Sequence, residues 1–150
     1  MKEIKVPLDP NYNQLNREST NRIKNLAANL NDEQMQTRVG EHWTVAIAFV
    51  HLAFWDRRVL ATLEETAKNG KLSVVEVETV VNDLSLPLWA VVPAKEAIKL
   101  AIESAQELDS QLEKFPKDLL EEMYEHNKRL VVRALHRNEH LDEVEEALRR

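Results

Sequence analysis

Three histidines have the sequence positions that a metal site would need. His51 stands in the most apolar helical segment, residues 44–63, and His136 and His140 stand four apart near the end of the chain. Residues four apart on a helix share one face, about 5–6 Å apart at Cβ, so two imidazoles can hold one cation. An unpartnered imidazole on an apolar face would be costly to bury. We therefore expect His51, His136 and His140 to meet in one metal site.

The same residues also allow a simpler interpretation. His51 could be a core histidine bonded to a backbone carbonyl or a carboxylate, and His42 and His126 fit exposed positions. Three histidines would leave coordination positions open for water or substrate, as in catalytic zinc sites. The candidate acceptors for the ring N–H groups are Asp56, Glu139 and Asp83. For Glu139 and Glu143 we favour a solvated helix face, and no catalytic residue is identified.

Composition limits the fold and the kind of partner. The chain has 150 residues, 43% of them hydrophobic, with two glycines, which favours helices in a single domain, residues 1–150. It has no cysteine, so any thiol must come from outside. A net charge of −6 argues against a nucleic-acid surface. Because neither a signal peptide nor a membrane-spanning segment is seen, we expect a cytoplasmic protein without membrane contact.

Apolar stripes at helical spacing predict four long helices. They cover residues 10–30, 44–69, 93–115 and 118–150, with a loop at 31–42. Thr44 fits an N-cap and Gly70 a C-cap. Four amphipathic helices predict an all-α four-helix bundle with a metal site between facing helices.

The connection between the second and third long helices is expected to be a short extra helix or irregular. Ser73 and Glu76 have capping-box spacing, although the valines around them also fit a strand. Residues 85–92 carry Trp89, which could form the wall of a pocket or close one end of the core.

Two segments resemble the DinB-like superfamily of DinB/YfiT-like metalloproteins. They read H-W-T-V-A-I-A-F-V-H-L-A-F-W-D-R-R-V-L at 42–60 and H-R-N-E-H-L-D-E-V-E-E-A-L at 136–148. The family has a W-[ST]-V entry into the second helix, a histidine in an H-L-A-x-W-[ED] context, and a ligand pair four apart on the last helix. His51, His136 and His140 fall on those positions. The doubled histidine of some hydrolase-like relatives is missing, since Val50 precedes His51.

The resemblance implies a DinB/YfiT-like four-helix bundle, often a homodimer, that binds zinc, nickel or another divalent ion. Characterised relatives include transferases and isomerases that use bacillithiol, mycothiol or glutathione. The implied function is a metal-dependent, thiol-linked transferase or detoxification enzyme with a small-molecule substrate. The alternative is a non-catalytic bundle, either a ligand-binding protein or a dimerising stress protein, whose metal is vestigial or structural.

Overall fold

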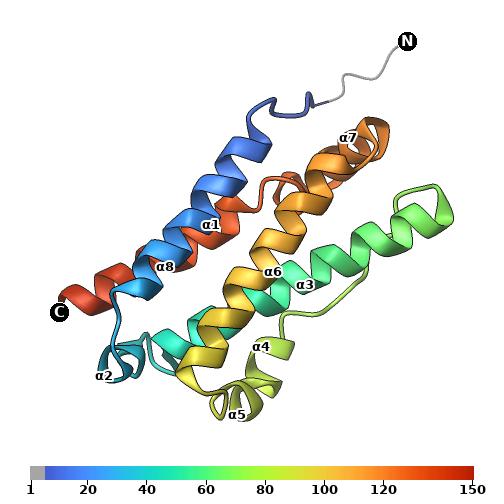
Figure 1. Cartoon of the computed structure of the whole chain (residues 1–150). Helices are drawn as coiled ribbons and strands as arrows, with labels where there is room; N and C mark the ends of the chain where they lie inside the picture. The colour runs from blue at the N-terminus through green and yellow to red at the C-terminus, as the bar shows by residue number, and fades with distance from the viewer. Residues whose placement is uncertain (1–5) are drawn as a thin grey trace.

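The computed structural model describes residues 6–150 and is all-α apart from one short hairpin, which confirms the predicted fold class (Figure 1). The long helices are α1 (Tyr12–Ala28), α3 (Val45–Asn69), α6 (Ala94–Lys114) and α8 (Ala134–Arg149). The shorter helices are α2 (Asp32–Met35), α4 (Val81–Leu84), α5 (Leu86–Trp89), α7 (Lys117–His126) and the 3₁₀ turn η1 (Lys128–Leu130). The hairpin pairs β1 (Arg38–Val39) with β2 (Trp43–Thr44).

The long helices contact one another in a closed ring. Helix α3 packs on α6 and α8, and α1 packs on the same two helices from the other side (Figure 1). Each long helix therefore contacts two others around the ring. Apolar side chains from α1, α3 and α8 fill its interior, among them Ile23, Phe49 and Leu141. Within the described residues no helix is both long and apolar enough to cross a membrane.

The ends of α3 form as the sequence predicts. The Thr44 hydroxyl accepts a hydrogen bond from the backbone N–H of Ile47 at 3.2 Å, which satisfies one of the unpaired N–H groups of the first turn. Gly70 ends the helix at φ +69°, in the left-handed region that a residue with a Cβ rarely adopts. Residues 45–69 therefore form one uninterrupted helix.

The prediction of a plain loop at 31–42 is wrong. Asn31 and Gln34 form a reciprocal capping box that stabilises the single turn of α2, and Gly40 at φ +71° allows the β1–β2 hairpin. The first long helix also begins two residues later than expected: its first residue is Tyr12 and not Pro10, and its N-cap is Asn11.

The segment after Gly70 is neither the short helix nor the strand that its sequence suggested. Residues 72–78 run extended, without strand pairing in the described structure. Two of its backbone N–H groups are bonded to hydroxyl groups of α3 instead. The N–H of Ser73 donates to Thr66 Oγ1, and the N–H of Val75 donates to Thr62 Oγ1. The short helices α4 and α5 follow, so the extra helical connection was predicted correctly but was placed too early.

The prediction of one continuous helix over 118–150 is also wrong, because helical structure is interrupted after α7. Asn127 takes an extended backbone conformation, and its side-chain oxygen accepts from the N–H of Arg129 to start η1. Val131 and Val132 are then buried before α8 begins at Ala134. Short polar side chains compete with helical hydrogen bonds in this way.

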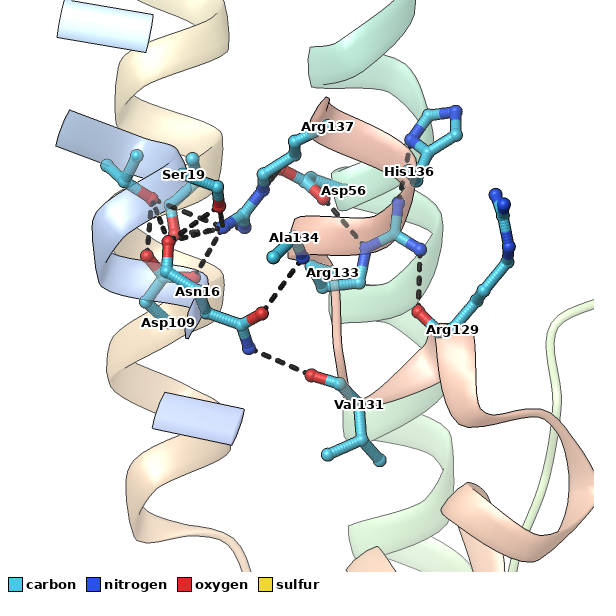
Figure 2. Close-up of polar contacts among 12 residues, drawn as sticks. Asn16, Ser19, Asp56, Asp109, Arg129, Val131, Arg133, Ala134, His136 and Arg137 are labelled. Carbon is cyan, nitrogen blue, oxygen red and sulfur yellow. Dashed lines mark hydrogen bonds and ion pairs between the residues drawn. The ribbon is translucent and has the colours of Figure 1, made fainter. Parts of the chain in front are cut away.

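A buried network of charged side chains joins the four long helices (Figure 2). The carboxylate of Asp56 on α3 accepts from Arg133 Nε at 2.9 Å and from Arg137 Nε at 3.0 Å, and both Asp56 and Arg137 are 0% exposed. Arg137 also donates to Asp109 on α6 at 2.8 Å and to Ser19 on α1 at 3.1 Å. Burial acts to lower the pKa of Arg137, but the charges of Asp56 and Asp109 hold it above its usual value.

Asp56→Ala should lower the free energy of unfolding by about 3–5 kcal/mol, because two buried guanidinium groups would lose their shared partner. Urea denaturation followed by circular dichroism measures this. Glu107→Ala is the matched control: it breaks the exposed pair with Arg57 and should cost at most about 1 kcal/mol. Equal losses in the two variants would show that the buried network does not hold the fold together.

Candidate metal centre

The structure brings His51, His136 and His140 together, as the sequence predicted. His51 lies on α3, and the other two lie one turn apart on α8. Nε2 of His51 is 3.2 Å from Nε2 of His136 and 3.1 Å from Nε2 of His140. One nitrogen from each ring lies within 4.8 Å of the others. In the described part of the chain this is the one group of three or more His, Cys, Asp or Glu side chains placed so that they could hold a metal ion.

These distances fit a divalent ion. Two imidazole nitrogens, each 2.0–2.1 Å from a tetrahedral zinc ion, lie about 3.3 Å apart. The observed separations fall within a few tenths of an ångström of that value. Nδ1 of His51 and of His140 is buried without a hydrogen-bond partner among residues 6–150, so those rings are held by packing. The cluster could therefore hold a metal through its three Nε2 atoms.

All three tryptophans of the chain surround His51. The ring centroids of Trp43, Trp89 and Trp55 lie 4.5, 6.0 and 6.3 Å from that of His51. This apolar enclosure disfavours a charged imidazole. Burial, with the nearby His140, lowers the pKa of His51 to about 3. The rings thus stay neutral, as metal ligation requires.

Burial also lowers the pKa values of the other two histidines. For His136 the charge of Arg133 acts in the same direction as burial. For His140 burial outweighs the opposing effects of Glu143 and Glu139.

Arg133 links the buried ionic network to His136 (Figure 2). Its guanidinium donates to Asp56 and to the Arg129 carbonyl, and its remaining nitrogen lies 3.2 Å from Nδ1 of His136. A guanidinium can only donate, so Nδ1 accepts, and the proton of the neutral ring lies on Nε2, facing His51. Binding a cation at Nε2 therefore requires either that the ring lose this proton or that the proton move to Nδ1. In the second case the guanidinium must turn aside.

None of the three carboxylates proposed as acceptors forms a hydrogen bond or ion pair with a histidine ring of the cluster. Asp56 reaches the cluster only indirectly: it accepts from Arg133, and Arg133 in turn lies against the ring of His136. Glu139 pairs with Arg129, and Asp83 is exposed. The carboxylate beside the cluster belongs to Glu143, whose Oε1 lies 3.2 Å from Nδ1 of His140 without hydrogen-bond alignment.

Sequence analysis missed Glu143, Arg133 and the enclosing tryptophans as parts of the site. The available signal for Arg133 was its spacing from Arg137, four residues apart on a helix that also carries the histidine pair. His42 and His126 are exposed, as expected. Trp89 is buried against Phe54 in the core, which supports the core-closing interpretation over the pocket wall.

The three histidines lie on the wall of a cavity of about 440 Å³. Its other lining side chains come from β2, α3, residues 79–82, the segment between α7 and α8, and α8 itself: Trp43, Trp55, Arg58, Thr79, Asn82, Asn127, Arg129, Leu130, Arg133 and Glu139. A cation held by the Nε2 atoms would thus face a space large enough for a small molecule.

Comparison with protein families gives a match over most of the chain. A family model described as the DinB superfamily matches residues 15–143, which include all three histidines and both segments of the cavity wall on α3 and α8. The comparisons with curated proteins and with solved structures gave no match.

Replacing His51, His136 or His140 with alanine should lower metal affinity by more than about 100-fold, because each change removes one of three ligands. The wild type should bind about one zinc, nickel or cobalt ion per chain. Elemental analysis and quenching of tryptophan fluorescence by Ni²⁺ measure this. His126→Ala is the control, since that histidine is exposed. Unchanged stoichiometry and affinity in His51→Ala would refute the site.

The metal-free protein should lose stability as the pH falls below about 6.5, the ordinary histidine pKa. Below that pH the histidines of the unfolded chain bind protons, whereas the buried imidazoles of the folded protein stay neutral. His51 stays neutral down to about pH 3, because its pKa is lowered to about 3. Each such histidine lowers the free energy of unfolding by about 1.4 kcal/mol per pH unit. Thermal unfolding between pH 7.5 and 5 should therefore show a shallower loss in the triple-alanine variant. Parallel profiles for the two proteins would contradict this.

Proposed function

The chain belongs to the DinB superfamily, and on that premise we propose that it is a divalent-metal-dependent enzyme that transfers an external thiol to a small electrophile. The observation that carries the proposal is the position of the three Nε2 atoms on the wall of a cavity, and not in a closed core. A structural zinc site is filled by four protein ligands, whereas a catalytic site keeps a position open. Three imidazoles beside a cavity match the second arrangement.

His51, His136 and His140 would hold the ion, and imidazole ligands suit zinc and nickel. A bound divalent ion lowers the pKa of a coordinated thiol and so supplies a thiolate at neutral pH. Because the chain has no cysteine, the sulfur must belong to a cosubstrate. Trp43 and Trp55 line the cavity beside the cluster and would exclude water from the reacting groups.

The experiment is a thiol-transfer assay on zinc- or nickel-loaded protein. Bacillithiol, mycothiol and glutathione are each offered with an activated aryl halide, and loss of free thiol is followed over time. We expect one thiol to be consumed faster than without protein, and His51→Ala to return the rate to that background. His126→Ala should retain the activity.

A different result would favour the non-catalytic alternative. If metal binds to the three histidines but none of the thiols reacts with any of a panel of electrophiles, the bundle is a ligand-binding or dimerising protein with a structural metal. If no metal binds, both the enzyme and the metal site are refuted.

We also propose a homodimer in the cytoplasm, where low-molecular-weight thiols are kept reduced. Large apolar side chains are exposed around α4 and α5, with 71% of Leu84, 69% of Leu88 and 77% of Val91 accessible. A second copy of the chain would cover them. Sedimentation equilibrium would then give twice the chain mass of 17.4 kDa, and a monomer would refute the dimer.

A further inference from the structure

The cavity beside the histidines is positively charged, although the chain as a whole carries −6. Arg58, Arg129 and Arg133 line it against a single carboxylate, Glu139, while burial keeps the imidazoles neutral. Two of the cationic side chains are already paired. Arg133 is bonded to Asp56 and the Arg129 carbonyl, and Arg129 pairs with Glu139 at 3.0 Å.

Arg58 is the exception. Its Nε donates to the carbonyl of Val75 at 2.7 Å, which fixes the guanidinium against the extended segment 72–78. Its two terminal nitrogens have no hydrogen bond or ion pair to any residue between 6 and 150. Both nitrogens are at least partly accessible, and Arg58 lines the cavity, so a ligand there can reach them. The side chain therefore presents a fixed pair of unused donors.

Two amides add further donors to the same wall. The Asn82 side-chain oxygen accepts from Trp55 Nε1 at 3.0 Å, and that of Asn127 accepts from the Arg129 N–H at 3.0 Å. Neither NH₂ group forms a hydrogen bond to a residue between 6 and 150, so both remain available as donors at the cavity wall. A wall rich in donors and poor in acceptors suits an anionic, oxygen-bearing ligand.

We propose that Arg58 binds a carboxylate of the thiol cosubstrate and so orients that molecule between the guanidinium and the three histidines. The paired terminal nitrogens of a guanidinium match the two oxygens of a carboxylate. His51 and Arg58 lie seven residues apart on α3, close to one helical face and roughly 10 Å apart along the axis. Trp55 lies between them, so the ligand would extend across its ring. This inference rests on the proposed function, because it takes the cosubstrate sulfur to lie at the metal.

The test uses the full chain loaded with Co²⁺, whose near-ultraviolet charge-transfer absorption reports thiol binding. The probes are mercaptopropionate, mercaptobutyrate and mercaptohexanoate with the thiol at the far end of the chain, each beside the matching mercapto alcohol. We expect at least one carboxylate to bind about tenfold more tightly than its alcohol. The chain length with the largest ratio measures the distance from the metal to Arg58.

Arg58→Met should reduce that ratio to about one, while the affinity for the alcohols stays the same. Arg58→Lys, which retains the charge, should keep part of the preference. Arg57→Met is the matched control, because it removes the same charge from the neighbouring, exposed residue that pairs with Glu107. Circular dichroism confirms that each variant is folded. Equal affinity of carboxylate and alcohol at every length, or an intact preference in Arg58→Met, would overturn the proposal.

Failure of the proposed function gives a separate signal. If Co²⁺ does not bind, or no thiol produces the absorption, the metal-dependent thiol reaction is refuted. The carboxylate subsite is then tested on the metal-free protein with glutarate and its uncharged diamide, through the fluorescence of Trp55. Binding of glutarate that is lost in Arg58→Met would support the subsite, and no difference between the two compounds would refute it.

Discussion

The carboxylate of Asp56 is the point on which the rest of this structure depends. It is buried in α3 and binds two guanidinium groups that α8 brings to it, Arg133 and Arg137. Taking such groups from water is costly, and only close pairing offsets the cost. The pairing also selects one arrangement of the helices, because any sliding of α8 along α3 would leave buried charges without partners. Arg137 extends the constraint to α6 and α1 through Asp109 and Ser19.

The same register assembles the histidine cluster. Helix α3 carries His51 and Asp56 five residues apart. Arg133, the N-cap residue of α8, and Arg137 within α8 alternate along the chain with His136 and His140. When the ion pairs form, the two histidines of α8 are placed opposite His51. Arg133 belongs to both systems, since it donates to Asp56 and also lies against the ring of His136. The scaffold and the site are thus one set of contacts.

The surroundings of the cluster have two parts with different consequences. Tryptophan rings and helix packing desolvate the imidazoles, which keeps them neutral at the expense of stability in acid. On the cavity side the arginines of α3 and of the segment after α7 give a positive wall. Neutral imidazoles beside fixed positive charge would favour an anionic ligand in this cavity over a neutral one.

The sequence by itself determined the local elements and the three histidines. Helical periodicity, Thr44 and Gly70 define α3, because capping and amphipathic spacing depend on residues a few positions apart. The histidine pair on α8 could be predicted for the same reason, and the cost of burying an unpartnered imidazole, together with the family resemblance, joined His51 to it. Only the tertiary structure decided the rest. The bonds of Asp56 span 77 and 81 residues of sequence, and no local pattern shows that an arginine will be buried. The segment 72–78 likewise depends on hydroxyl groups of α3, and the stretch before α8 depends on Asn16 of α1, whose side chain bonds to Val131 and Ala134. These satisfied backbone groups outweigh helix propensity.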